Sequence, residues 1–350
     1  MASVGDVDIY DFIADLPKAE LHLHIEGTLG PEIVLRLARR NGVDLPFSST
    51  AEIEQALEDR PIDLEGFLGH HYLVVQVFRT EEDFFDVTYE LLRECRENNI
   101  VYTELFFDPQ AHTSRGVQFD SIVEGIGEGL RRGSGDFGVE AGLIMCLNRE
   151  RSVASAREML SLAERYRDQI LGLGLDSYEE GNPPRKFVEI YANARDRGYH
   201  LTAHCDVDQT DSVDHIWECL DLLGVERIDH GVNAIEDPRL IQELISRGVG
   251  LAVSPVRLNA DRGPEDVDRI KQLYEAGVLV SLNTDDPAEF PSGYLTNMLL
   301  EVQAASGYEK RDLVRFIANA FESSWLPPAR KASYLASLHE FARSRGVTVR

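Results

Sequence analysis

Two histidines separated by one residue, His22 and His24, lie in the short apolar segment AELHLHIE at 19 to 26. Side chains alternate between the two faces of an extended strand, so both imidazoles point to the same side. His204 and Asp285 end two other apolar segments. Three imidazole nitrogens and a carboxylate oxygen suit zinc and leave a position for water, with another transition metal as the alternative. The sequence therefore predicts a site for one divalent ion.

Three residues near these candidate ligands are expected to take part in the chemistry. His230 ends the segment ERIDHGV and is expected to orient and stabilise a metal-bound hydroxide, with a fifth ligand as the alternative. Asp285 is expected both to ligate the metal and to accept the proton of water. Asp286 is expected to accept a hydrogen bond from the substrate, with capping of the next helix as the alternative.

Eight short apolar segments rich in β-branched residues alternate with amphipathic stretches, which is typical of strands alternating with helices. We therefore expect a (β/α)8 TIM barrel, with an open doubly wound sheet as the alternative. A barrel places its active site at the carboxyl ends of its strands, where these histidines and aspartates lie. The segments are at 19 to 26, 100 to 108, 139 to 147, 169 to 177, 200 to 206, 226 to 232, 248 to 255 and 278 to 286.

The interval between the first and second segments is the longest and has a helical pattern. Residues 28 to 99 include TEEDFFDVTYELLRECREN, with apolar residues three and four apart. We expect extra helices inserted after the first strand. A last helical segment, at about 310 to 345, is expected to pack outside the barrel. We expect one metal-dependent domain over residues 8 to 345.

The composition narrows the range of partners. The formal net charge is −26 and the sequence pI is about 4.7, so the surface repels nucleic acid and points to a neutral or cationic small molecule. The four cysteines form no CxxC pair, which fits reduced thiols in the cytoplasm. We expect neither a signal peptide nor a membrane span. A homo-oligomer is compatible with the sequence.

Four segments resemble the adenosine and adenine deaminase family of the amidohydrolase superfamily: PKAELHLHIEGTL, GLGLDSYEEGNPP, RIDHGV and SLNTDDPAEF. The resemblance covers nearly the whole chain and is strongest to bacterial and fungal adenine deaminases, which ELFFDPQAHT and LDSYEEGNPPRKF also resemble. It implies a (β/α)8 barrel that usually holds zinc. It also implies metal binding by the four candidate ligands, orientation of hydroxide by His230 and purine contact by Asp286.

The same resemblance bears on the substrate through two glutamates. Nucleoside deaminases of the family have Asp at the position of Glu26, where it helps to hold the ribose, and adenine enzymes have Glu. The longer side chain fills space that the sugar would need, which favours a free base. Glu179 is a candidate acceptor for the ring N–H of that base, with a solvated loop residue as the alternative.

One departure from the family concerns the catalytic acid. The family has HAGE after the fifth strand, and its Glu protonates the purine ring, whereas this sequence has His204-Cys205-Asp206-Val207-Asp208. Valine cannot transfer a proton. Strand alternation points Asp206 into the site with His204, and Asp208 one step further on. Asp206 is the expected replacement acid and would need a raised pKa, with Asp208 as the alternative.

These observations favour zinc-dependent hydrolysis of adenine to hypoxanthine and ammonia. A first alternative keeps the reaction and changes the substrate to an N6-substituted adenine, an adenosine-like nucleoside or another aminated heterocycle, because SPVRLN at 254 to 259 also departs from the family. A second alternative is a catalytically weak member that binds a purine, suggested by Val207.

Overall fold

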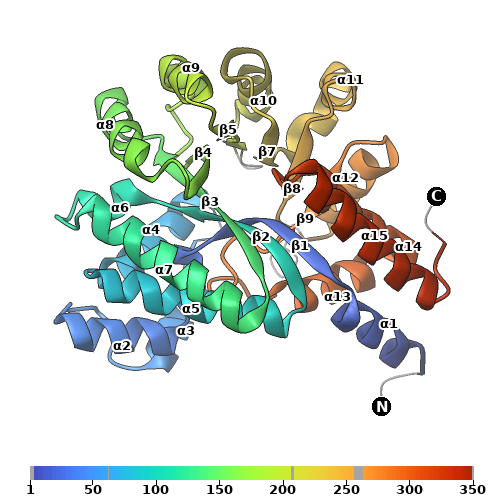
Figure 1. Ribbon diagram of the computed structural model, residues 1–350, viewed down its shortest axis with the longest axis horizontal. Coiled ribbons are helices and arrows are strands. Elements are labelled where there is room, and N and C mark those ends of the chain that lie inside the picture. Colours follow the sequence, from blue (N-terminus) through green and yellow to red (C-terminus); the bar gives the residue numbers. More distant parts are fainter. Residues whose placement is uncertain (1–3, 62, 206–208, 256–262, 349–350) are drawn as a thin grey trace.

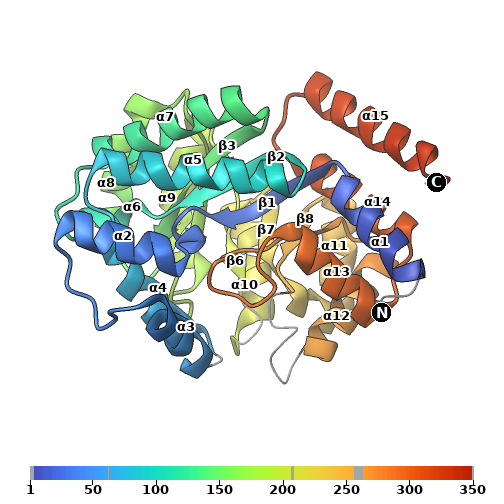
Figure 2. The same ribbon diagram turned by 90° about the horizontal axis from the view of Figure 1, so that it is seen from below.

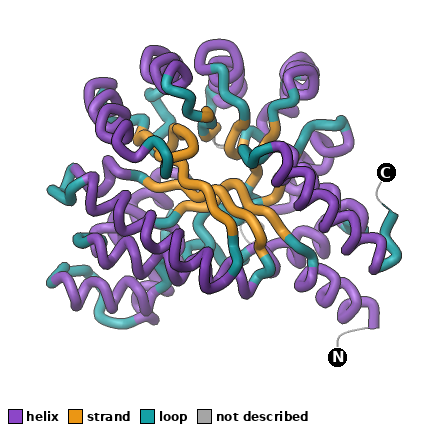
Figure 3. The backbone as a smooth tube through the Cα atoms, in the orientation of Figure 1, coloured by secondary structure: helices purple, strands orange, loops and turns teal. Residues whose placement is uncertain are grey.

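The computed structural model describes residues 4–61, 63–205, 209–255 and 263–348. Parallel strands occupy the centre and helices surround them (Figures 1 and 3). In the described part of the chain the strands are β1 (Lys18–His24), β2 (Ile100–Phe107), β3 (Glu140–Asn148), β4 (Ile170–Asp176), β5 (His200–Leu201), β6 (His204–Cys205), β7 (Arg227–His230), β8 (Gly250–Val253) and β9 (Val280–Leu282).

The strands follow chain order, and every hydrogen-bonded pair is parallel. One run of neighbours is β1-β2-β3-β4-β5 and the other is β6-β7-β8-β9. β5 and β6 are two parts of one strand position, interrupted at Thr202 and Ala203. The backbone still bonds to both sides there, because Thr202 N donates to Leu173 O and Asp229 N donates to Ala203 O, each at 3.0 Å. Eight strand positions result, as predicted.

The barrel closes between β1 and the residues that follow β9. Leu23 forms an isolated parallel bridge with Asp285. His24 N donates to Asp285 O at 2.9 Å, and Asp285 N donates to His22 O at 3.0 Å. This seam completes the (β/α)8 barrel that the sequence predicts, and the open doubly wound sheet is wrong.

Fifteen α-helices lie in the described part of the chain. They are α1 (Val4–Asp15), α2 (Pro31–Asn41), α3 (Thr50–Asp59), α4 (Leu64–Val74), α5 (Glu81–Glu97), α6 (Pro109–Thr113), α7 (Phe119–Phe137), α8 (Val153–Ala163), α9 (Val188–Asp196), α10 (Ser212–Glu218), α11 (Pro238–Arg247), α12 (Gly263–Glu275), α13 (Leu295–Ser306), α14 (Lys310–Ser323) and α15 (Pro328–Ser344). Short 3-10 turns occur at Glu26–Thr28, Val75–Val77, Glu164–Tyr166, Pro184–Phe187 and Val232–Glu236, and a π-helical turn at Cys219–Leu223.

The extra helices predicted after the first strand are present. α2, α3 and α4 come between β1 and α5, and Figure 2 shows them grouped on the opposite side of the molecule from α15. The last helical segment forms α14 and α15, and α15 packs on the outside of α14. None of the helices in the described ranges is long and apolar enough to cross a membrane.

Local sequence explains why these elements begin and end where they do. All seven residues of β1 are buried although four of them are polar, which agrees with a strand enclosed by helices on the outside and by the barrel interior. α11 shows the end signals clearly: Asp237 caps its first turn by accepting from Arg239 N at 3.0 Å, and Pro238 occupies its first position. Gly248 ends it with φ of 66°, a left-handed conformation that glycine adopts without steric cost.

Candidate active site

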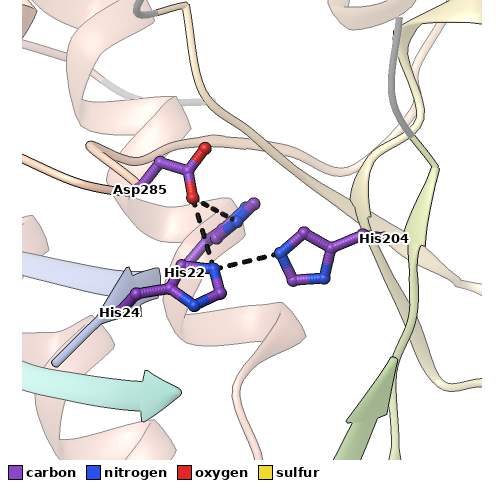
Figure 4. A group of neighbouring side chains, drawn as sticks. All are labelled: His22, His24, His204 and Asp285. Atoms are coloured by element: carbon purple, nitrogen blue, oxygen red, sulfur yellow. Dashed lines mark hydrogen bonds and ion pairs between the residues drawn. The ribbon is translucent and has the colours of Figure 1, made fainter. Parts of the chain in front are cut away.

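The four candidate metal ligands meet at the carboxyl ends of the strands. His22 and His24 extend from β1, His204 from β6, and Asp285 follows β9; one ligand atom from each lies within 4.8 Å of the others. His22 Nε2 is 3.0 Å and His24 Nε2 3.3 Å from Asp285 Oδ1. Figure 4 shows the three rings and the carboxylate directed toward one another. All four residues are buried.

Each of the three histidines has an oxygen facing its second ring nitrogen. His22 Nδ1 donates to Ala252 O at 3.0 Å. His24 Nδ1 is 4.0 Å from Asp176 Oδ2, and His204 Nδ1 is 3.6 Å from Asp229 Oδ2. The Ala252 carbonyl holds the proton on His22 Nδ1 and leaves the Nε2 lone pair for a metal, whereas the two carboxylates lie near the outer nitrogens of His24 and His204 but beyond hydrogen-bond distance. The sequence analysis missed these partners, although Asp176 and Asp229 stand at strand ends.

The geometry fits a cation between the rings. His24 Nε2 and His204 Nε2 are 3.1 Å apart. Burial lowers the pKa of His24 to about 4 and holds that of His204 well below its usual range, so both rings are neutral. Two neutral ring nitrogens held this close can both coordinate one positive ion between them. The donor set of three nitrogens and one oxygen suits zinc.

His230 and Asp285 share an unusual backbone conformation at the rim of the barrel. Each has φ of 63° in the left-handed region, which is uncommon for residues other than glycine. His230 ends β7, and its Nε2 lies 3.6 Å from Asp285 Oδ2. Strained backbone of this kind is often found at functional sites. The structure thus brings His230 to the metal-ligand cluster, on the oxygen of Asp285 that faces away from His22.

A cavity of about 480 Å³ opens over the cluster, within the size range of small-molecule sites. The strand ends supply a polar wall that includes Asp108, Asp176, Ser177 and Asp286. α3, α4 and the loop after β9 supply a second wall, in which apolar side chains lie among charged ones such as Glu54, Glu58 and Arg60. Among its residues are Leu57, Leu64, Phe67, Leu68 and Phe290. The cavity therefore joins a carboxylate-rich floor to a partly apolar cover built by the inserted helices.

Asp286 lines this cavity, beside the metal-ligand cluster. Its Oδ1 is buried and has no hydrogen-bond partner among the described residues. The next helix, α13, begins only at Leu295, so the alternative role as helix cap is wrong. Burial and the carboxylates of Asp285 and Glu289 raise the pKa of Asp286 well above its usual range. Gly27 packs so closely on Asp286 that a methyl group there would overlap the carboxylate.

Glu26 and Glu179 lie outside the residues that line the cavity. Glu26 is buried behind Asp108, and its Oε1 accepts from Asp108 N at 3.0 Å and from His112 Nε2 at 2.8 Å. Glu179 is fully buried; its Oε1 accepts from His215 Nδ1 at 2.5 Å and its Oε2 lies 3.0 Å from Arg149 Nη1. The alternative of a solvated loop residue at Glu179 is therefore wrong. Direct substrate contact by either glutamate stays a prediction.

Two sequence predictions fall outside the described residues. Asp206, Val207 and Asp208 belong to one such segment, and the end of SPVRLN belongs to the other. The structure also adds cavity residues that the sequence analysis did not select, among them His71, Tyr72 and Glu289, and it places Asn148 behind the lining residue Asp108. Asn148 Nδ2 donates to Asp108 Oδ2 at 2.8 Å.

The chain is similar to known proteins over most of its length. Residues 17–341 match the model of the family described as adenosine deaminase. An uncharacterized deaminase of Schizosaccharomyces pombe is 40% identical over 335 residues, covering 96% of this chain and 98% of that protein. An adenine deaminase of Chlorobium luteolum is 43% identical over 335 residues, covering 95% of this chain and 96% of that protein. The crystal structure of adenine deaminase from Arthrobacter aurescens superposes with a TM-score of 0.88 at 37% identity. The match covers 94% of this chain and 99% of that one.

Removing the metal should destabilise the protein. A chelator would leave the close, buried ring nitrogens of His24 and His204 without a shared cation. We therefore expect the Tm to fall and to recover when zinc is added back. Free zinc at 100 times its Kd should contribute about 2.7 kcal/mol of folding free energy. Thermal unfolding with metal analysis checks this. In His204→Asn the zinc-dependent rise in Tm should be largely lost; an unchanged rise would contradict ligation by His204.

Gly27→Ala should displace Asp286 without removing the metal ligands. The added methyl group overlaps the Asp286 carboxylate, so we expect kcat/KM to fall roughly 10²-fold through misplacement, with bound zinc unchanged. Gly30→Ala is the matched control, because no atom lies within 4 Å of its added Cβ. Equal activity of the two variants would show that the close approach of Gly27 to Asp286 is not needed.

Proposed function

The chain belongs to the adenosine deaminase family of metal-dependent hydrolases, and we propose that it deaminates adenine to hypoxanthine and ammonia at one zinc ion. The observation that carries this proposal is the buried cluster of three imidazoles and Asp285 at the floor of a cavity sized for a small molecule. The adenine deaminases among its relatives, similar over nearly their whole length, support adenine as the substrate.

His22, His24, His204 and Asp285 would hold the zinc ion. When bound there, zinc supplies a nucleophile at neutral pH by lowering the pKa of water. The Ala252 carbonyl fixes the His22 ring, and the Asp176 and Asp229 carboxylates lie near the outer nitrogens of the other two rings. The requirement for a divalent ion follows from the family, and zinc is our choice because of the nitrogen-rich donor set.

Asp285 and His230 are placed to handle the proton and the charge. Asp285 presents Oδ1 to the ligand nitrogens and Oδ2 to His230. We propose that the Asp285 carboxylate accepts the proton that water loses and returns it to the leaving amino group. His230 stabilises the negative charge as the C6 centre becomes tetrahedral.

The cavity favours an uncharged base that is rich in N–H groups. Asp108, Asp176, Asp286 and Glu289 all line it, and Arg60, the arginine of the lining, is engaged with Glu289. A phosphorylated substrate would therefore meet repulsion. We propose that Asp286 contacts the purine ring directly. Glu26 is predicted from the sequence to contact the substrate; in this proposal it acts indirectly, by holding Asp108 in place.

In the same proposal Glu179 acts on the metal site indirectly, through Arg149. Arg149 joins it to the metal site, since Arg149 Nη1 donates to His204 O at 3.1 Å and lies 3.0 Å from Glu179 Oε2. The pair is fully buried. A buried and paired charge holds its neighbours in place because separating it is costly. We propose that Glu179 supports the ligand strand rather than the substrate.

A second candidate substrate is an N6-substituted adenine. The partly apolar cover from α3 and α4, including Leu57, Phe67 and Leu68, offers room for a substituent beyond the ring. This second substrate would be hydrolysed by the same reaction at the same proposed metal site. The catalytically weak purine-binding alternative rests on Val207 alone.

A substrate panel separates these proposals. The zinc-loaded protein should release ammonia from adenine with a kcat/KM well above those for adenosine, AMP and N6-methyladenine. Faster release of amine from N6-methyladenine would favour the second candidate. Binding of hypoxanthine without turnover of any aminopurine would favour the catalytically weak member.

We propose Asp206 as the acid that protonates the ring, with Asp208 as the alternative. Asp206→Asn should lower kcat by about 10²- to 10⁴-fold, the usual value of a positioned acid, while zinc content and hypoxanthine binding stay close to those of the parent. Asp208→Asn, assayed alongside, is the control. Full activity in Asp206→Asn with loss in Asp208→Asn would exchange the two assignments.

A further inference from the structure

Two consecutive histidines on α4 have different surroundings. His71 lines the cavity, whereas His70 is not among the lining residues and packs on Phe47 with ring centroids 6.0 Å apart. Both side chains are buried. Neither was selected from the sequence. The contrast singles out His71 as the histidine of the inserted helices that can meet a ligand.

Glu289 holds the imidazole of His71 in place. His71 Nδ1 donates to Glu289 Oε1 at 2.6 Å. Glu289 is itself fixed, because its N donates to Asp286 O at 2.9 Å and its O accepts from Arg60 Nη2 at 2.8 Å. The Arg60 guanidinium lies 5.1 Å from the centroid of the Phe67 ring, and Phe67 also packs on His71 at 5.6 Å. The ring orientation is thus set by the inserted helices and the loop after β9 together.

In this arrangement Nδ1 of His71 is hydrogen-bonded to Glu289, and Nε2 remains available to a ligand. Nε2 makes no hydrogen bond to any residue in the described ranges, while the side chain borders the cavity. Burial lowers the pKa of His71, but the Glu289 carboxylate outweighs it and raises the pKa above the usual value. A ring that carries both protons presents Nε2–H as a donor. The polar wall opposite consists largely of carboxylates, which accept.

Asp286 lies beside the same imidazole ring, on its Nδ1 side. Its Oδ1 is 3.9 Å from His71 Nδ1 and has no hydrogen-bond partner among the described residues. A purine ring edge offers both N–H donors and nitrogen lone pairs. A carboxyl group and an imidazole side by side match such an edge, because together they provide an acceptor and a donor.

We propose that His71 is a substrate-binding residue whose Nε2 hydrogen-bonds a ring nitrogen of the purine at the edge beside Asp286, and that Glu289 is the positioning residue that holds it there. The proposal rests on the proposed function and deepens it. It assigns to α4, outside the barrel, a polar contact that selects a ring with an acceptor at this edge.

Calorimetry with hypoxanthine and kinetics with adenine test His71. His71→Asn should raise KM for adenine and the Kd of hypoxanthine about 10- to 100-fold, the usual loss for a hydrogen bond from a charged donor. kcat, zinc content and Tm should change much less. His70→Asn is the matched control on the same helix and should keep both constants within about twofold.

The role of Glu289 has a pH readout. The charged groups around His71 are Glu289 and Asp286 from the loop after β9, Asp108 after β2, Glu26 after β1 and Arg60 before α4. With protonated His71 as donor, KM should be low below its raised pKa and rise above it. Glu289→Gln removes the charge that raises this pKa, so the rise in KM should begin at lower pH.

Unchanged KM and hypoxanthine affinity in His71→Asn would overturn the proposal, and so would equal losses in His70→Asn, which would assign the effect to packing of α4. A wild-type protein that binds hypoxanthine but turns over no aminopurine would refute the proposed function only. In that case the hypoxanthine Kd values of the variants still decide the role of His71.

Discussion

The seam that closes the barrel also carries the proposed metal ligands. The backbones of His22 and His24 bond to the backbone of Asp285, and the side chains of the same three residues converge on one point. Closure thus fixes the ligand geometry, since neither first nor last strand can shift without moving ligand atoms. Conversely, three imidazole nitrogens and a carboxylate held together in a buried place form a donor set suited to a cation. A bound ion would therefore stabilise the closed barrel.

Chemistry and selectivity come from different parts of the fold. The strand ends supply the ligands, His230 and the carboxylates of the floor. The inserted helices and the loop after β9 supply the partly apolar cover and, in our proposal, the donor at His71. This division is common in barrels, where a rigid scaffold carries catalytic groups and longer connections adapt to the ligand. In our proposal, substrate preference depends on α3 and α4 and is separate from the metal ligands.

The barrel was predictable because most strand positions are nearly continuous apolar segments, as burial on both faces requires, and because they alternate with amphipathic stretches. The interruption at Thr202 and Ala203 was not, since it depends on how neighbouring strands bond. Periodicity and strand ends indicated where His22, His24, His204 and Asp285 would meet. Asp176 and Asp229 stand at strand ends and could have been selected by the same rule. The pair of His71 and Glu289 depends on a contact between distant segments, which leaves no local signal. The burial of Glu179 depends on Arg149 and His215, which sequence spacing does not reveal.

The residues that form the seam, His22, His24 and Asp285, are far apart in the chain, which affects how the protein folds during synthesis. The first two ligands leave the ribosome early, and Asp285 appears only after the residues of the other strands have been made. A nascent chain therefore lacks both the closing contacts and the full ligand set until most of it has emerged. Pairings so distant in sequence also form slowly, because the entropy of bringing the ends together must be overcome first. Tight binding of the ion should therefore mark molecules that have finished folding and exclude incomplete ones.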